Sequence, residues 1–280
     1  MTEKFSFSKI STFTNCPYSY YLNYVKKPKP YNEQNVYGQL GGTCHECIEE
    51  MIKGNIDENQ AKDRFEEDLF ECEILDMDFP SFKGDKELIK NNYVASIHHY
   101  FDNFTLFHEK PDYHAIEEYF EYEIEGTLFR GYIDYYYIVG DDLHCIDFKT
   151  SSKFSKKELE KKKLQLIIYG MYLKNKYPDK NIYCYFDMLK YIKGKRGGLK
   201  ERHKLGFLEE GERGIIEVTF DEENINQLRE YIRCTIGEIN HLSKEDVDDW
   251  KPIKDCKKSY FCKTLCGFRK TCKYFNDVEV

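Results

Sequence analysis

The segment GYIDYYYIVGDDLHCIDFKT, residues 131–150, decides the fold, because it reads as two β-strands joined by a tight turn. Apolar and polar side chains alternate on both sides of Gly140 and Asp141, as they do in strands that bury one face. A glycine in the first position is typical of a two-residue type II′ turn. The sequence therefore predicts an antiparallel hairpin in this segment.

The register of this hairpin brings two acidic residues together. With a two-residue turn, Val139 faces Asp142, and counting back along both strands places Asp134 directly opposite Asp147. Directly opposed side chains share a face, with Cβ atoms roughly 4.5 to 5.5 Å apart. Two carboxylates at that separation repel each other unless a cation lies between them, and hard oxygen ligands suit Mg²⁺ or Mn²⁺. We therefore predict a divalent metal site, with Lys149 on the same face.

Four motifs in chain order resemble the PD-(D/E)XK nuclease superfamily, and more narrowly its RecB-like branch, to which AddB and the CRISPR-associated RecB-like exonucleases belong. The family pattern is a histidine on an early helix, a Gly-x-Ile-Asp strand, an (Asp/Glu)-x-Lys strand and a Gln-x-x-x-Tyr helix. In this chain the motifs read as His45, GYID at 131–134, DFK at 147–149 and QLIIY at 165–169. The resemblance implies a metal-dependent DNA nuclease, expected to be an exonuclease that acts on DNA ends or single strands.

The same resemblance implies an α/β fold with mixed α and β elements. Its restriction-endonuclease-like core is a central mixed β-sheet flanked by helices, here with a helical insertion and a C-terminal cysteine-rich cluster segment. We expect a single RecB-like nuclease domain over residues 1–280. Its parts would be a helical N-terminal part at 1–110, the nuclease core at 111–242 and a cysteine-rich cluster-binding tail at 243–280.

Periodicity and capping residues predict the individual elements. A first helix capped by Ser6 or Ser8 is expected to run to about Val25, before Pro28 and Pro30. Further helices are predicted at 58–77, 85–108, 156–176 and 222–242, strands at 114–125, 182–192 and 215–220, and a loop at 194–214.

Another helix is predicted to open at Thr43, because Thr43 and Glu46 form a capping-box pattern before an apolar stripe. His45 then lies in the first turn of this helix. There the positive end of the helix disfavours a protonated imidazole, which leaves a nitrogen lone pair for a metal.

The resemblance implies a role for each motif residue around the metal. Asp134, Asp147, the backbone carbonyl of Phe148 and Nε2 of His45 would hold the ion. Lys149 would orient the attacking water or stabilise the transition state, and the two aspartates would serve in catalysis as well as in metal binding.

Gln165 and Tyr169 are four residues apart and share one helix face. By the same resemblance this face borders the active site, where both residues would contact the DNA strand or fix Lys149. An additional site carboxylate is expected on the strand before the hairpin. Glu121 and Glu123 both fit, because alternation puts them on one face, so the sequence leaves the choice open.

The C-terminal cysteines follow the pattern Cys256-x5-Cys262-x3-Cys266-x5-Cys272. Four thiols on so short a segment indicate a metal or a cluster. The resemblance implies a 4Fe-4S cluster held by Cys16 together with Cys262, Cys266 and Cys272. A local set that includes Cys256, binding Zn²⁺ or a cluster, is the alternative.

The composition fits a globular protein. Of the 280 residues 41% are hydrophobic, which is ample for a buried core. No apolar run approaches the roughly 20 residues of a membrane helix, and the start lacks the plan of a signal peptide, so we expect a cytoplasmic location. Eleven cysteines in that setting are better read as reduced thiols or metal ligands than as a disulfide framework.

The net charge of −8 argues against a generally basic DNA-coating protein. It does not exclude DNA as a partner, because a nuclease needs only a local basic path and its metal offsets the carboxylates. Lysine-rich segments at 153–163 and 190–202 are candidates for that path.

Partner proteins are also expected. The sequence has no Gly-x4-Gly-Lys-(Ser/Thr) loop, so any unwinding of DNA must come from a partner such as a helicase. Stand-alone nucleases of this kind occur in phage replication and recombination, in CRISPR adaptation and in host repair, which makes recombination or adaptation proteins further candidates. The alternative function is a noncatalytic DNA-binding or partner-binding protein that keeps the nuclease fold and an iron-sulfur or zinc site.

Overall fold

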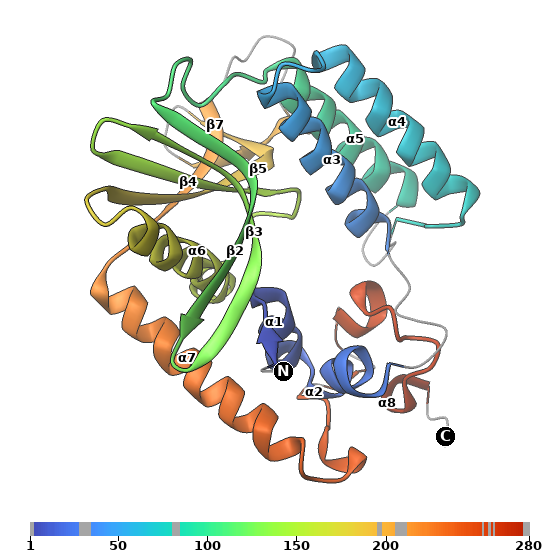
Figure 1. The fold of residues 1–280 in the computed structure, drawn as a ribbon. Coiled ribbons are helices and arrows are strands. Elements are labelled where there is room, and N and C mark those ends of the chain that lie inside the picture. Colours follow the sequence, from blue (N-terminus) through green and yellow to red (C-terminus); the bar gives the residue numbers. More distant parts are fainter. Residues whose placement is uncertain are drawn as a thin grey trace. The chain divides into compact units, whose positions relative to one another are not determined.

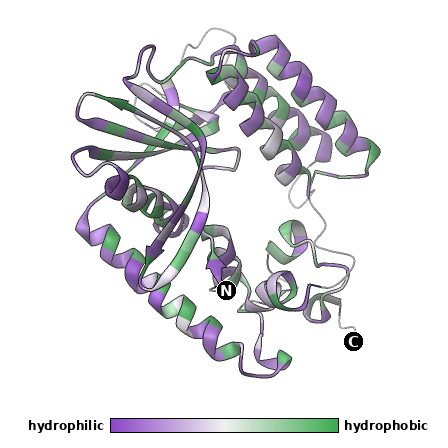
Figure 2. Ribbon diagram, in the orientation of Figure 1, coloured by the Kyte–Doolittle hydropathy of each residue, from purple (hydrophilic) through white to green (hydrophobic). Residues whose placement is uncertain are grey.

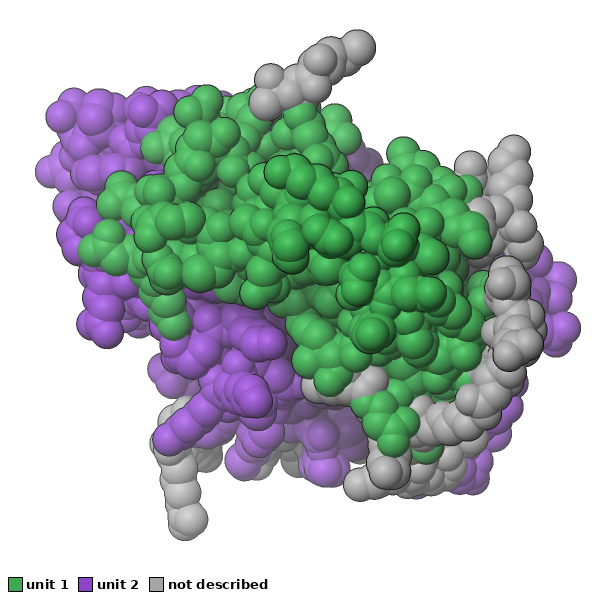
Figure 3. All heavy atoms as spheres, turned by 90° about the horizontal axis from the view of Figure 1, so that it is seen from below, with its two compact units in different colours: residues 1–35, 121–131, 226–280 green, residues 36–120, 132–225 purple. Residues whose placement is uncertain are grey.

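The computed structural model describes residues 3–27, 35–79, 85–194, 198–204, 212–253, 255–256, 259 and 261–276. The chain divides into two compact units (Figure 3). Unit 1 comprises residues 1–35, 121–131 and 226–280, and unit 2 comprises residues 36–120 and 132–225. Helices and strands are mixed along the chain, as the sequence predicts.

The β-strands form a mixed sheet of seven strands. They are β1 (Lys4–Phe5), β2 (Tyr113–Ile124), β3 (Thr127–Val139), β4 (Asp142–Lys149), β5 (Asn181–Lys193), β6 (Leu199–Glu201) and β7 (Glu212–Val218). The main path runs β1-β3-β4-β5-β6, with β2 paired to β3 and β7 paired to β5. The β1–β3 and β4–β5 pairs are parallel, whereas β4 is antiparallel to β3, and β6 and β7 are antiparallel to β5.

The hairpin of β3 and β4 has the predicted turn and register. Gly140 has a φ of 57°, the left-handed value that the first position of a type II′ turn requires. The ladder runs from the pair Val139–Asp142 to the pair Tyr135–Ile146. The next residue toward the start of β3 is Asp134, and the next residue toward the end of β4 is Asp147. These are the two aspartates predicted to bind the metal.

Helices cover both faces of the sheet within unit 2 (Figure 1). Three pack on one face and a fourth lies on the other: α3 (Val36–Ile52), α4 (Glu58–Ile74), α5 (Lys86–Asp102) and α6 (Lys156–Lys176). A buried apolar cluster joins the first three to the sheet through Tyr135, Ile146 and Phe148. This arrangement confirms the predicted mixed sheet flanked by helices.

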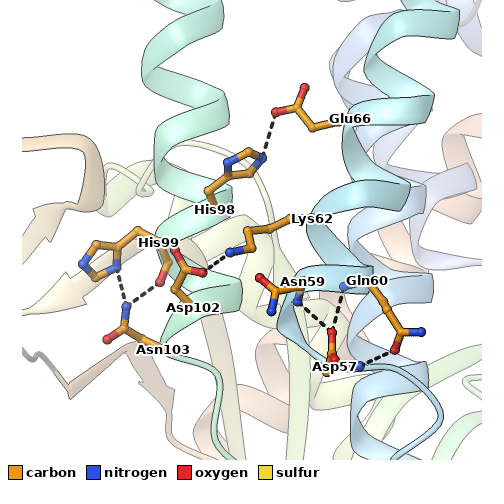
Figure 4. A network of polar contacts seen from close by, with 9 residues as sticks. All are labelled: Asp57, Asn59, Gln60, Lys62, Glu66, His98, His99, Asp102 and Asn103. Carbon is orange, nitrogen blue, oxygen red and sulfur yellow. Dashed lines mark hydrogen bonds and ion pairs between the residues drawn. The ribbon is translucent and has the colours of Figure 1, made fainter.

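Polar contacts fix α4 against α5 (Figure 4). Asp57 begins α4 with a reciprocal capping box. Between the helices, His98 Nε2 lies 3.0 Å from Glu66 Oε1, and Lys62 Nζ lies 2.5 Å from Asp102 Oδ1. Most of α4 is hydrophilic (Figure 2), and exposed ion pairs contribute only about 0 to 1 kcal/mol each. The buried side chains therefore supply most of the stability of this helix pair.

The predicted start of the helix that carries His45 is wrong. α3 begins at Val36, well before Thr43, so His45 lies in the interior of the helix instead of in its first turn. The Thr43 hydroxyl does not cap the helix but donates to the Asp68 carboxylate of α4, with the Gln39 carbonyl at 3.4 Å as a more distant acceptor. The helix extends upstream because Val36 and Leu40 continue its buried stripe, which outweighs the low helix propensity of Gly38, Gly41 and Gly42.

Unit 1 is mainly helical. Its elements besides strand segments are α1 (Phe7–Asn15), α2 (Pro17–Tyr20), the π-helix η1 (Tyr21–Lys26), most of α7 (Glu222–Leu242), the 3₁₀-helix η3 (Val247–Asp249), the π-helix η4 (Phe261–Leu265) and α8 (Lys273–Asn276). Trp250 is buried among aromatic rings and stacks on Tyr20 with ring centroids 5.8 Å apart. The aromatic residues of the first helices therefore serve the core of this unit.

The expected first helix is broken at Cys16. Ser6 caps α1 as predicted, its hydroxyl accepting a hydrogen bond from Lys9 N. Cys16, however, has φ −162° and ψ 106°, an extended conformation that the following Pro17 favours. The break makes Cys16 the N-cap of α2, with its sulfur accepting a hydrogen bond from Ser19 N at 3.4 Å.

The remaining boundaries lie close to their predictions with two exceptions. The helix expected at 85–108 ends at Asp102, and the expected loop at 194–214 contains β6, the 3₁₀-helix η2 (Arg202–Lys204) and the start of β7. Pro28 and Pro30, predicted to end the first helix, lie outside the described residues, as do residues 195–197 of the second lysine-rich segment. None of the helices in the described ranges combines the length and apolar character that a membrane crossing requires.

Candidate active site and cysteine pocket

The middle of β3 and the end of β4 bring the two predicted aspartates near each other in unit 2. Asp134 Oδ2 accepts a hydrogen bond from the backbone N–H of Phe148 at 2.8 Å. Burial, together with the charge of Asp147, raises the pKa of the Asp134 carboxyl well above its usual range. The two side chains are therefore close enough to interact electrostatically, as the hairpin register indicates.

His45 reaches the same point from α3. Its Nδ1 lies 3.5 Å from Asp134 Oδ2, and its imidazole hydrogen-bonds to the backbone of Phe148. Burial lowers the pKa of His45, and the nearby charge of Asp147 opposes this shift only in part. A neutral imidazole is thus favoured near neutral pH, but burial is the cause and the predicted helix N-terminus is not.

Glu117 of β2 is a third acidic residue at this point. Ligand atoms of His45, Glu117 and Asp134 lie within 4.8 Å of one another, so this group could hold a metal ion. Glu117 has a φ of 48°, which is uncommon for a residue other than glycine. Ile116 before it packs on the α3–α5 cluster, whereas Glu118 after it hydrogen-bonds to α6 on the other face. The left-handed residue therefore interrupts the alternation of β2 in the manner of a β-bulge.

The sequence did not single out Glu117, because strict alternation was assumed along β2. The two residues considered there, Glu121 and Glu123, are both exposed, and Glu121 forms an ion pair with Lys4 within unit 1. A glutamate with a positive φ cannot be recognised from the alternation of apolar and polar residues in a strand. The only hint is the pair of adjacent glutamates at 117–118 in a strand otherwise rich in apolar and aromatic residues.

Asp147 is a buried carboxylate with an ion pair but without hydrogen bonds in the described part of the chain. It is 1% exposed, and within the described residues neither of its oxygens accepts a hydrogen bond. Lys149 Nζ lies 2.5 Å from Asp147 Oδ2, an ion pair without hydrogen-bond geometry. Buried polar groups are normally hydrogen-bonded. Orphaned oxygens beside a His, Glu and Asp group match the ligand set that a divalent cation prefers, so the residues fit the predicted Mg²⁺ or Mn²⁺.

A chain of hydrogen bonds connects Lys149 to α6. Lys149 Nζ donates to Gln165 Oε1 at 3.2 Å, and Gln165 Nε2 donates to the Tyr169 hydroxyl at 2.7 Å. Burial raises the pKa of Tyr169 well above its usual range, so its hydroxyl stays protonated. The structure thus brings together the motif residues of both strands and of the following helix.

Five cysteines line one pocket in unit 1. They are Cys16, Cys256, Cys262, Cys266 and Cys272, accompanied by aromatic and aliphatic side chains. The pocket therefore contains the expected set of four and also the competing Cys256. Burial raises the pKa of Cys16 and of Cys266 to about 11.

The thiols of this pocket differ in the hydrogen bonds that their sulfurs accept. The sulfurs of Cys16, Cys266 and Cys272 each accept at least one backbone hydrogen bond, which favours the thiolate form. Cys256 instead forms side-chain contacts with Cys262 and Cys272, and its pKa is raised by burial and by both neighbours. Three of the four expected ligands thus have the backbone donors that support a metal-bound thiolate.

The candidate metal group and the lysine beside it are features of a nuclease. A comparison of the whole sequence with models of protein families agrees. The family model described as the PD-(D/E)XK nuclease superfamily matches residues 4–273. The chain therefore belongs to the PD-(D/E)XK nuclease superfamily, which implies a nuclease that usually depends on Mg²⁺ or Mn²⁺. Among curated proteins, none matches this chain significantly.

Proposed function

We propose that this protein is a Mg²⁺- or Mn²⁺-dependent deoxyribonuclease of the RecB-like branch, acting as an exonuclease on DNA ends or single strands. The observation that carries the proposal is the convergence of His45, Glu117 and Asp134 beside Asp147, a buried carboxylate whose one close partner is the Lys149 ammonium. These side chains, with the Phe148 carbonyl, would hold the metal. A bound divalent ion supplies Lewis acidity to a phosphate oxygen and lowers the pKa of a water.

The remaining motif residues act on the substrate side of this site. Lys149 offers an ammonium group beside Asp147, where it would orient the attacking water or offset charge on the phosphate in the transition state. Gln165 holds that ammonium through its amide oxygen, and Tyr169 fixes the amide through its hydroxyl. Gln165 and Tyr169 would therefore act by positioning Lys149.

The test is single-turnover cleavage of end-labelled single-stranded and double-stranded DNA with Mn²⁺ or Mg²⁺. We expect Asp147→Asn and Lys149→Ala to lower the rate by at least about a hundredfold. Glu123→Gln is the matched control, since it removes an exposed carboxylate from β2. Product lengths read from each labelled end would give the polarity and separate exonuclease from endonuclease cleavage.

Two outcomes would overturn this proposal. Equal cleavage by wild type and both variants would mean that the activity does not come from this site. DNA binding by the wild type without cleavage, at any divalent metal concentration, would favour the noncatalytic DNA-binding or partner-binding alternative.

We also propose that Cys16, Cys262, Cys266 and Cys272 hold a 4Fe-4S cluster that acts as a structural clasp within unit 1. Backbone donors at three of these thiols support this set over one that includes Cys256. A single zinc ion would need its thiolates about 3.8 Å apart, from a tetrahedral Zn–S distance of about 2.3 Å. Among the described residues, no three cysteine sulfurs lie within 4.8 Å of one another, which favours a larger centre.

Anaerobic purification tests the cluster. We expect absorbance near about 400 nm, with iron and sulfide in the protein. Cys266→Ser should lose the iron, while Cys256→Ser should retain it, and the exposed Cys234→Ser is the control. Zinc without iron, or loss of iron in Cys256→Ser alone, would contradict this assignment.

The setting of the activity is part of the same proposal. We infer that the protein works in the cytoplasm with a helicase or with a recombination or adaptation protein, because the sequence carries no nucleotide-binding loop of its own. Phage replication, recombination, repair and CRISPR adaptation all offer such partners. Faster cleavage of duplex DNA after addition of a helicase and ATP would support this part of the proposal.

A further inference from the structure

One lysine of α6 differs from its neighbours in the run Lys161, Lys162 and Lys163. Lys161 is exposed, and Lys163 forms an ion pair with Glu160 at 2.5 Å. Lys162 is half-buried, and among the described residues no carboxylate lies within ion-pairing distance of its ammonium. A partly desolvated cation without a direct ion pair is costly in a folded protein, so its environment requires a physical explanation.

Helix geometry directs Lys162 toward the candidate active site. It lies three residues before Gln165 and seven before Tyr169, which places all three on one face of α6. Gln165 accepts a hydrogen bond from Lys149. The charges of Lys149 and Asp147 both act on the Lys162 ammonium, as does that of Glu158 one turn earlier on α6. The site therefore carries a second lysine beside the one in the Asp-x-Lys motif.

The charges within this group leave room for an anion. Lys149 is paired with Asp147 at 2.5 Å, so the Asp147 carboxylate already serves another ammonium, and the Glu158 carboxylate accepts a hydrogen bond from the backbone N–H of Ser155. Burial and repulsion from Lys149 lower the pKa of Lys162 in the absence of substrate. A negatively charged ligand would relieve this repulsion, and the anion that a nuclease brings to its site is the phosphate backbone of a nucleic acid.

We propose that Lys162 binds a backbone phosphate of the DNA strand next to the scissile phosphate, as a substrate-binding residue outside the family motifs. This inference rests on the proposed nuclease function and extends it to a named contact with the strand. The contact is electrostatic and independent of base identity, so it would hold any sequence equally well.

Salt-dependent binding tests this contact without requiring cleavage. Fluorescein-labelled oligothymidine is titrated with protein in EDTA, by anisotropy, between about 50 and 200 mM KCl. We expect Lys162→Ala to raise Kd roughly tenfold and to reduce the slope of log K against log salt by about 0.7, the value for one phosphate contact on a single strand. Lys162→Arg should keep the slope, and Lys174→Ala, on the same helix but bonded to the Lys180 carbonyl, should behave as wild type.

The outcomes separate this inference from the proposed function. If wild type cleaves DNA with Mn²⁺ but Lys162→Ala keeps the wild-type Kd and slope, this inference alone is overturned. An equal loss in Lys162→Arg would indicate a packing role and would overturn it as well. Should Lys162→Ala fail to fold, Lys162→Gln, with its longer side chain, is measured in its place after its melting temperature has been compared with wild type.

Discussion

Glu117 shows at the scale of one residue how backbone conformation can create a site. Its φ of 48° is disfavoured for a side chain with a Cβ, by about 1 to 2 kcal/mol. In this backbone conformation, the Glu117 carboxylate lies in one group with ligand atoms of His45 and Asp134. An unfavourable backbone conformation that persists at a cluster of ligands is typical of functional sites.

Substitution of Glu117 should therefore change the stability of the protein and its affinity for metal in opposite directions. Glu117→Asn removes the charge and suits the left-handed conformation, so we expect the free energy of unfolding in EDTA to rise by up to about 1 kcal/mol. We expect Mn²⁺ affinity, measured by calorimetry, to fall about tenfold or more.

Glu117→Gln is the matched control, because it loses the charge but keeps the strained backbone. It should lose Mn²⁺ affinity to a similar extent and gain less stability than Glu117→Asn. Wild-type Mn²⁺ affinity in both variants would exclude Glu117 as a ligand.

Asp134 should make stability depend on pH. Burial raises its folded-state pKa above the ordinary value of 3.8, so the folded protein holds a proton that the unfolded chain releases. The contribution of Asp134 to stability is therefore greatest at low pH and is lost as pH rises from about 3.8 through the raised pKa. Glu117 adds to this trend, because burial raises its pKa as well.

A divalent metal should reverse this loss, since it replaces the bound proton. We expect the rise in melting temperature caused by Mn²⁺ over EDTA to increase from about pH 5 to about pH 8. Scanning fluorimetry of wild type and Asp134→Asn measures it. The same Mn²⁺ effect in Asp134→Asn would show that the ion binds elsewhere.

Two glycines show, at the scale of secondary structure elements, how the site is supported. Gly42 lies in the interior of α3, the helix that carries His45, and a Cβ there would meet nothing within 4 Å. Gly214 lies in β7, where a Cβ would come within 2.6 Å of the Tyr191 carbonyl and 2.8 Å of the Met188 carbonyl. The first glycine is replaceable, whereas the second is required by close approach of two backbones.

Alanine substitution should consequently have opposite effects on these two elements. Gly42→Ala should raise the free energy of unfolding by about 0.5 to 1 kcal/mol, because alanine is the better helix former. Gly214→Ala should lower it by at least about 1 to 3 kcal/mol, since the backbone of β5 cannot yield as a side chain would. Urea unfolding of both variants measures the difference, and destabilisation by Gly42→Ala would contradict the packing described for α3.

At the scale of the whole molecule, the division into two units separates the two centres. The candidate metal group belongs to unit 2, and the five-cysteine pocket belongs to unit 1. The pocket draws its thiols from the first helices and from the C-terminal segment. A cluster there would therefore join parts of unit 1 that are distant in sequence.

Removal of the cluster should increase hydrogen exchange mainly in the segments that carry its cysteines. After anaerobic chelation of iron, we expect faster hydrogen exchange in residues 3–27 and 261–276, and little change in α3, α4 and α5. Hydrogen exchange followed by mass spectrometry measures this difference. Uniform acceleration across all of these segments would show that the two units unfold together.

The sequence by itself determined the elements whose signals are local. The turn at Gly140 and the alternation around it predicted the register that pairs Val139 with Asp142, and the structure has that register. Periodicity likewise predicted the helix at 156–176, and the spacing of Gln165 and Tyr169 predicted that both lie on one face of it.

Tertiary structure alone decided the features that depend on packing. The left-handed conformation of Glu117 is held by contacts on both faces of β2, and the low pKa of His45 arises from burial, so neither is written in local pattern. The position of Cys256 beside Cys262 likewise depends on how the C-terminal segment folds. Turn, capping and periodicity signals act between near neighbours in sequence, whereas desolvation and backbone strain depend on every group that surrounds a residue, wherever it lies in the chain.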